Sequence, residues 1–301
     1  MNITASILRG LGECAACCLL VLGSGCATMH CHATQSEPAH AIPEHTERHD
    51  LGPRTVLVFK SAKTDEPRPH IVLLLHEIPG FNAATADFAG RLAEKGFTVY
   101  APIMVGKPLE SGWWPPLRNF LEVVLSPDWP TLRTSHSPAV LPDLHVALQK
   151  IREQHPGEPI GIIGMCMSGT LPLALMSEPG TRIAAVCQPA LPMLPWTQQR
   201  RRNLALGVDD LNAGFARINT GHLVVLGFRY KDDGLSTAGR LEEIQRHMAP
   251  DGGTYRDYQI PPEEDPMTQH ATFTSGYGSA ATQRRFADLV TEFTRALSHP
   301  N

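Results

Sequence analysis

From residue 51 onward, short apolar runs alternate with longer stretches in which apolar residues recur every three or four positions. Short apolar runs bounded by turn residues are typical of buried strands, and the wider spacing is typical of helices with one buried face. The pattern predicts strands at 55–60, 70–76, 97–102, 159–163, 183–187, 222–228 and 254–260. It predicts helices at 82–95, 141–154, 237–248 and 280–297. Such alternation indicates the α/β class, with a mostly parallel sheet covered by helices on both faces.

The segment 105–140 interrupts this alternation. It is rich in proline and contains Trp113, Trp114 and Trp129. Loops of this length are usually functional or disordered, and three tryptophans argue against disorder. Two interpretations stay open: a lid or pocket wall over the site, with Trp113, Trp114 and Arg118 as pocket residues, or an insertion that packs on the surface.

The N-terminus resembles an export leader. Residues 14–22 form an apolar core that is too short to span a membrane, and Leu22-Gly23-Ser24-Gly25-Cys26 is similar to a bacterial lipoprotein cleavage box. We therefore expect residues 1–26 to be a signal or lipoprotein leader. The protein would then be exported or tethered to a membrane through lipidated Cys26, the alternative being a cytoplasmic protein.

Residues 27–50 are rich in His, Pro, Glu and Thr and show no periodicity. This composition predicts a disordered linker, followed by one catalytic domain over 51–299. The histidines of the linker have no spacing that matches a standard metal site, so no metal is predicted.

Overall composition narrows the class of partner. The 301 residues are 42% hydrophobic and carry a net charge of -4, whereas nucleic-acid-binding proteins usually carry a basic excess. Nucleic acid is therefore not expected as a partner. Five of the seven cysteines lie in the first 31 residues, which leaves Cys166 and Cys187 in the body and no disulfide framework. Cys187 lies in an apolar run and is interpreted as a buried strand residue.

The segment Gly164-Met165-Cys166-Met167-Ser168-Gly169 carries the candidate chemistry. It lies between a predicted strand and a helix-compatible stretch, 170–176, and has the form of a nucleophile elbow with cysteine in the serine position. Small residues are needed there because the backbone turns in a strained conformation. A helix that starts at the elbow directs N–H groups toward the sulfur and favours the thiolate.

A cysteine nucleophile needs a base, and the base needs an acid that orients it. In α/β-hydrolases the chain order is nucleophile, acid, histidine. Asp232 and Asp233 follow a strand beyond the elbow, and His270 lies in a loop before the last helix. His247, by contrast, falls within a predicted helix. The order predicts a Cys166–Asp–His270 triad and leaves the two aspartates open.

With these motifs the chain resembles the dienelactone hydrolase family over roughly residues 50–298. The resemblance rests on the elbow, on residues 73–82 (LLLHEIPGFN) and on residues 226–235 (LGFRYKDDGL). It implies an α/β-hydrolase fold, with Asp233 as the acid and Glu77 beside the sulfur, where it helps to control ionisation. It also implies an oxyanion hole formed by the backbone N–H groups of Ile78 and Met167.

Two departures from the family concern the elbow and the substrate. The family elbow usually has glycine where this chain has Ser168, and the dienelactone enzymes hold the substrate carboxylate with arginines, one shortly after the catalytic histidine. Residues 271–274 contain no arginine. A neutral or bulkier ester or lactone is therefore expected, hydrolysed through an acyl-enzyme without a cofactor. The alternatives are a thioesterase or peptidase, a small-molecule-binding protein and a thiol-redox protein.

Overall fold

The structure is a computed structural model that describes residues 46–61, 70–78, 80–110, 114–126, 129, 135–193, 195–262 and 269–298. An eight-stranded sheet runs through these residues in the order β1-β2-β4-β3-β5-β6-β7-β8. The strands are β1 (Thr46–Asp50), β2 (Thr55–Phe59), β3 (His70–Leu75), β4 (Phe97–Pro102), β5 (Ile160–Met165), β6 (Thr181–Cys187), β7 (Val224–Tyr230) and β8 (Thr254–Ile260). β1 pairs antiparallel with β2, and β2 pairs antiparallel with β4. The remaining pairings in the sheet, between β4, β3, β5, β6, β7 and β8, are all parallel.

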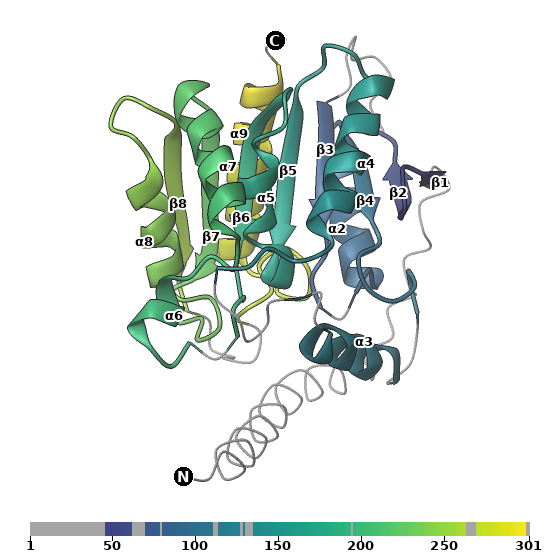
Figure 1. Cartoon of the computed structure of the whole chain (residues 1–301). Coiled ribbons are helices and arrows are strands. Elements are labelled where there is room, and N and C mark those ends of the chain that lie inside the picture. The colour runs from purple at the N-terminus through teal and green to yellow at the C-terminus, as the bar shows by residue number, and fades with distance from the viewer. Residues whose placement is uncertain are drawn as a thin grey trace.

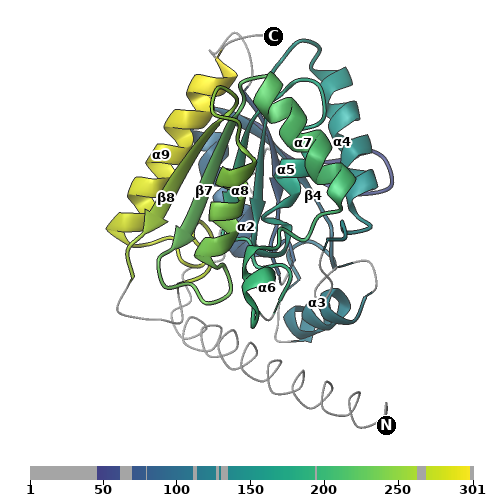
Figure 2. The same cartoon turned by 60° about the vertical axis from the view of Figure 1, so that its left-hand side comes forward.

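Helices cover both faces of this sheet (Figures 1 and 2). One face packs against α4 (Leu141–Gln154), α5 (Leu171–Leu175), α7 (Val208–Thr220) and α8 (Ala238–His247), and the other packs against α2 (Ala83–Glu94) and α9 (Ala280–Leu297). The short helices α3 (Trp114–Leu125) and α6 (Gln198–Arg202) lie at the end of the molecule where the parallel strands terminate (Figure 1). The predicted α/β-hydrolase fold is confirmed.

The side chains of the central strands show why helices pack on both faces of the sheet. In β3, Ile71 and Leu73 are buried on the α4 side, whereas Val72 and Leu74 are buried on the α2 side. Successive side chains of a strand point to opposite faces, so a strand buried on both faces is an unbroken apolar run. This arrangement brings the carboxyl ends of β3, β5 and β7 to one edge, where the candidate residues lie.

Three helices, α3, α6 and α7, were missed by the apolar pattern. α3 lies within the proline-rich segment, and its prolines occupy the first turn, where a missing N–H costs nothing. α7 contains Gly214, where a Cβ atom would come within 2.0 Å of the Leu173 carbonyl oxygen on α5. A glycine that lowers helix propensity is needed there so that two helices can approach each other.

The linker prediction is wrong at its end, because Thr46–Asp50 form strand β1. β1 pairs with β2 in antiparallel register from Thr46 opposite Phe59 to Asp50 opposite Thr55. Polar side chains conceal such an edge strand in a sequence, since it is held by backbone hydrogen bonds and faces solvent. The ordered domain therefore includes residues that precede 51.

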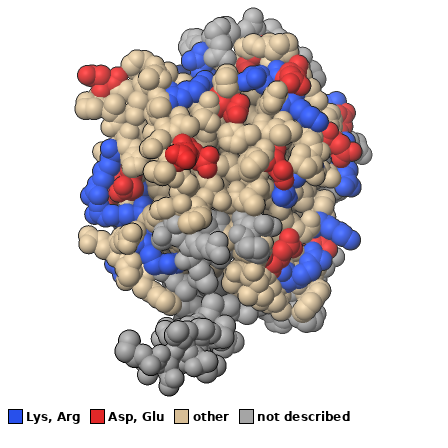
Figure 3. Space-filling model, viewed as in Figure 1, with Lys and Arg blue, Asp and Glu red and all other residues tan. Residues whose placement is uncertain are grey.

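The leader and its Cys26, with the rest of residues 1–45, lie outside the described residues. Within the described part of the chain, no helix is both long and apolar enough to cross a membrane. The face seen in Figure 3 carries acidic and basic side chains that are interspersed with uncharged ones.

Deletion of the N-terminus should separate the leader from the edge strand. A protein that begins at Thr46 should fold and keep full turnover, because the candidate triad residues lie wholly in the body of the chain. A protein that begins at Leu51 loses the β1 pairing and should unfold at lower temperature. Thermal melts followed by circular dichroism, with turnover measured in parallel, check both. Equal melting temperatures would show that β1 contributes nothing to stability.

Candidate active site

Cys166 occupies a strained position at the carboxyl end of β5. Its φ is +53°, in the left-handed region that non-glycine residues rarely adopt. The glycines on either side are required by contact: a Cβ at Gly164 would come within 2.4 Å of the Ser168 carbonyl oxygen, and one at Gly169 within 2.7 Å of the Cα of Pro189. The side chain of Cys166 remains partly exposed. A sharp turn that presents a thiol at the sheet edge is what the elbow motif predicts.

The helical segment after the elbow is shorter than expected. A single 3₁₀ turn spans Cys166–Ser168, and α5 covers only Leu171–Leu175. A five-residue helix has few aligned peptide dipoles, so the positive charge at its N-terminus is smaller than that of a long helix.

Ser168 explains the departure from glycine in this elbow. Its side chain is fully buried, and its Oγ lies 3.0 Å from the carbonyl oxygens of Leu75 and His76 and 3.1 Å from the Met165 nitrogen. The hydroxyl accepts the Met165 N–H and donates to this group of carbonyls. It therefore joins the nucleophile turn to the end of β3.

Asp233 is buried and forms a pair with the partly exposed His270. The Nδ1 atom of His270 lies 2.8 Å from Oδ2 of Asp233, whose other oxygen accepts the N–H groups of Leu235 and Ser236, both at 2.9 Å. Asp232 is exposed. Of the two aspartates that the sequence left open, Asp233 is the one that contacts the histidine.

Burial, charge and hydrogen bonding shift the pKa values of both members of the pair. Burial opposes ionisation of Asp233, but the charge and hydrogen bond of His270 and the two N–H groups outweigh it, so the pKa of Asp233 is lowered. Burial also lowers the pKa of His270, yet the charges of Asp233 and Cys166 raise it well above its usual value. His270 Nε2 is buried and makes no well-aligned hydrogen bond within the described residues. Catalytic hydrogen bonds are often loose before substrate binds.

Glu77 is buried directly after β3, and its contacts run to the histidine loop (residues 269–279). Thr274 donates to Oε1, and the Gln188 amide lies 3.4 Å from Oε2. Gln188 in turn accepts from Thr272 at 2.5 Å. Burial raises the pKa of Glu77 despite these donors and the nearby charge of His270. The sequence did not indicate Gln188, Thr272 or Thr274, because buried polar residues carry no local signal.

The residues proposed for the oxyanion hole lie on two adjacent loops. Ile78 is in the tight turn after β3, closed by a 2.8 Å hydrogen bond from the Gly80 N–H to the Glu77 carbonyl. Met167 follows Cys166 and is buried. Because β3 and β5 are paired neighbours, these two N–H groups belong to the same edge of the sheet.

The sequence pattern also gave no indication of Arg240, because an arginine in a helix is usually exposed to solvent. Its side chain is fully buried, and it donates to the carbonyl oxygens of Pro189 and Pro192 at 2.7 and 2.6 Å. Burial lowers its pKa to about 10, while the charges of Asp233 and Cys166 act in the opposite direction. Arg240 thus supplies a buried positive charge beside the candidate triad.

The expected pocket residues are placed differently. Trp113 lies outside the described residues, and Trp114 on α3 is 53% exposed. Arg118 is paired with Glu110, its Nη1 lying 3.2 Å from Oε1. Arg118 is therefore committed to a neighbour rather than free for a substrate anion.

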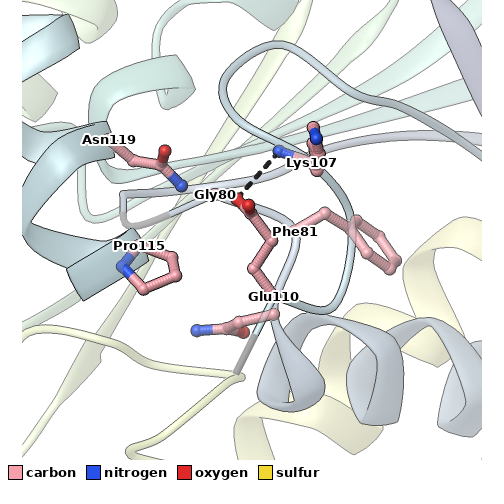
Figure 4. A pocket seen from close by; sticks show the side chains of 7 residues that line it. Gly80, Phe81, Lys107, Glu110, Pro115 and Asn119 are labelled. Atoms are coloured by element: carbon pink, nitrogen blue, oxygen red, sulfur yellow. Dashed lines mark hydrogen bonds between the residues drawn. The ribbon is translucent and has the colours of Figure 1, made fainter. Parts of the chain in front are cut away.

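A small hollow lies between α3 and the loops that follow β3 and β4, lined by Gly80, Phe81, Asn82, Lys107, Glu110, Pro115 and Asn119 (Figure 4).

Cys187 is buried and is not bonded to Cys166. Burial and the charge of Glu77 raise the pKa of Cys187 well above its usual value. No cluster of metal-ligating side chains occurs among the described residues.

The Asp233–His270 pair should make stability depend on pH. The pKa of His270 is raised on folding, so its contribution is complete below about pH 6.5 and is lost as pH rises through the higher folded value. Asp233→Asn should therefore lower the free energy of unfolding more at pH 6 than at pH 9, as measured by urea titration. Asp232→Asn, the exposed neighbour, is the control. Equal losses for Asp233→Asn at both pH values would contradict this coupling.

Comparison with known proteins agrees with the fold. Residues 55–198 match the model of the dienelactone hydrolase family. No curated protein matches the chain. A candidate dienelactone hydrolase of Klebsiella pneumoniae is similar at a TM-score of 0.58 and 18% identity, covering 83% of this chain and 98% of that one.

Two further solved structures share the fold. A dienelactone hydrolase-like promiscuous phosphotriesterase from metagenomic libraries has a TM-score of 0.54 at 16% identity, over 83% of this chain and 97% of that one. A thermostable esterase from Pseudomonas putida has a TM-score of 0.58 at 12% identity, over 90% and 88%. Residues 55–198, just under half of the chain, thus resemble the dienelactone hydrolase family, and the described domain shares its fold with these solved structures.

Proposed function

We propose that the protein hydrolyses a neutral carboxylic ester or lactone through a covalent acyl-enzyme on Cys166. The observation that carries the proposal is the partly buried Asp233–His270 pair beside a cysteine in a left-handed turn. Asp233 fixes the proton on Nδ1 of His270, which leaves Nε2 as the base. Geometry and charge thus support a distinct role for each residue.

The reaction divides into two acyl-transfer steps. His270 Nε2 accepts the Cys166 proton as the sulfur attacks the ester carbonyl carbon, and the N–H groups of Ile78 and Met167 stabilise the tetrahedral oxyanion. When the carbon–oxygen bond breaks, His270 returns the proton to the leaving alcohol. Water then attacks the thioester, with His270 again as base, and regenerates the thiol. Each oxyanion donor contributes about 3 kcal/mol in sites of this kind.

The alternative functions make different demands on the residues of this site. A thioesterase or peptidase would use the same residues, so the substrate panel must separate it from an esterase. A redox role needs a resolving thiol, and the raised pKa of buried Cys187 keeps that thiol protonated. A purely binding role leaves the hydrogen-bonded Asp233–His270 pair unexplained.

Removal of the nucleophile should abolish activity without unfolding the protein. Cys166→Ala should lose all measurable turnover of a short-chain p-nitrophenyl ester, while Cys187→Ala, the matched buried cysteine, should keep it. His270→Ala should lower kcat by ~10²-fold or more as the base is removed. His247→Ala is its control, because His247 packs edge-on against Phe215 at the end of α8. Wild-type turnover in Cys166→Ala, or a larger loss in His247→Ala than in His270→Ala, would refute the assignment.

Substrate charge should matter because an unpaired anion is costly to bury. Among the described residues, Arg118 is paired with Glu110 and buried Arg240 binds backbone carbonyls, so neither side chain is free. A dienelactone-type lactone acid should therefore have a lower kcat/KM than its own methyl ester, with both measured on one preparation. A preference for the acid would show that a cation reaches the site. Loss of that preference in Arg118→Gln would then identify it.

A further inference from the structure

His76, which the proposed mechanism does not use, lies fully buried at the end of β3, next to the proposed oxyanion loop. Its Nε2 lies 2.9 Å from the Met104 nitrogen, and its Nδ1 lies 3.0 Å from the Glu77 carbonyl oxygen. A backbone N–H can only donate, so Nε2 must be the acceptor. The proton is therefore on Nδ1, which donates to the Glu77 carbonyl.

That carbonyl belongs to the same peptide unit as the N–H of Ile78. A peptide unit is planar, and in the trans form its C=O and N–H point in opposite directions. The Glu77 carbonyl accepts two hydrogen bonds, from His76 Nδ1 at 3.0 Å and from the Gly80 N–H at 2.8 Å. Two donors on one side fix the direction in which the Ile78 N–H points on the other.

We propose that His76 is a positioning residue of the oxyanion hole, whose Nδ1–H aims the Ile78 N–H at the developing oxyanion. This inference rests on the proposed function. Donation to the carbonyl also polarises the peptide and strengthens its N–H as a donor. The residue acts through the backbone and does not touch the substrate.

The surroundings of His76 hold it in this state. Arg54 donates to the Met104 carbonyl at 3.0 Å and to Asp143 on α4 at 2.8 Å, which anchors the segment that supplies the Met104 N–H. Burial, together with the positive charge of Arg54, lowers the pKa of His76 to about 4. The imidazole therefore stays neutral near pH 7, and Met104 keeps its acceptor.

Two substitutions separate the two hydrogen bonds. The amide of asparagine reaches the position of Nδ1, so His76→Asn keeps a donor for the Glu77 carbonyl and leaves the Met104 N–H without its acceptor. The longer glutamine reaches the position of Nε2, so His76→Gln accepts from Met104 and gives up the bond to Glu77. His155→Gln is the matched control, a half-buried histidine bound to Tyr100 at the far end of α4.

The readouts are kcat and KM for a short-chain p-nitrophenyl ester, the rate at which iodoacetamide alkylates Cys166, and the melting temperature. His76→Gln should lose roughly 10- to 100-fold in kcat, less than the ~10²–10³ of a deleted donor. Its KM and alkylation rate should be unchanged, because alkylation forms no oxyanion. His76→Asn should keep kcat and melt at lower temperature.

Any other pattern overturns the inference: wild-type kcat in His76→Gln, equal losses in both variants, or an alkylation rate that falls in parallel with kcat. Failure of this inference is distinguishable from failure of the proposed function. If Cys166→Ala is inactive and His76→Gln is not impaired, only the role of His76 is wrong. If Cys166→Ala remains active, the proposed function itself fails.

Discussion

The left-handed backbone of Cys166 is the constraint on which the rest of the site depends. For a residue with a Cβ this conformation costs about 1–2 kcal/mol, so it persists only where the surroundings leave no alternative. Here the glycines on either side pack directly against neighbouring backbone, and the Ser168 hydroxyl bonds the turn to the end of β3. Cys166, Met167 and the loop that carries Ile78 are therefore fixed to one another before any substrate binds.

The histidine loop, in contrast, is positioned by contacts with distant segments. Phe273 stacks on Phe88 of α2 at 5.5 Å, and its carbonyl accepts from Arg91 of the same helix at 2.6 Å. Thr272 and Thr274 bond to Gln188 and Glu77. A side chain that must reach both Asp233 and the sulfur needs such anchoring, since small misplacements of catalytic groups reduce the rate strongly. The polar network between the loops thus holds the histidine loop in place.

Local sequence patterns predict the elements that depend on residues close together in the chain, but not those that depend on distant partners. The bounds of α4, β8 and α9 follow from apolar spacing, and the elbow follows from its glycines and its place after a strand. α7 and β1 were missed because a glycine set against another helix, and a polar strand held by its backbone, are explained only by their partners. Arg240 escaped notice for the same reason. Its helix gives no sign that four backbone carbonyls surround the guanidinium.

The two buried carboxyl groups of the site show how one environment assigns opposite roles. Asp233 accepts two backbone N–H groups and the imidazole of His270, and these donors lower its pKa in spite of burial. Glu77 has one hydroxyl donor and a long amide contact, so burial prevails and raises its pKa. Carboxyls whose pKa values are displaced in opposite directions are typical of acid–base sites. Asp233 is therefore held in its ionised form beside the histidine, whereas burial favours the neutral form of Glu77.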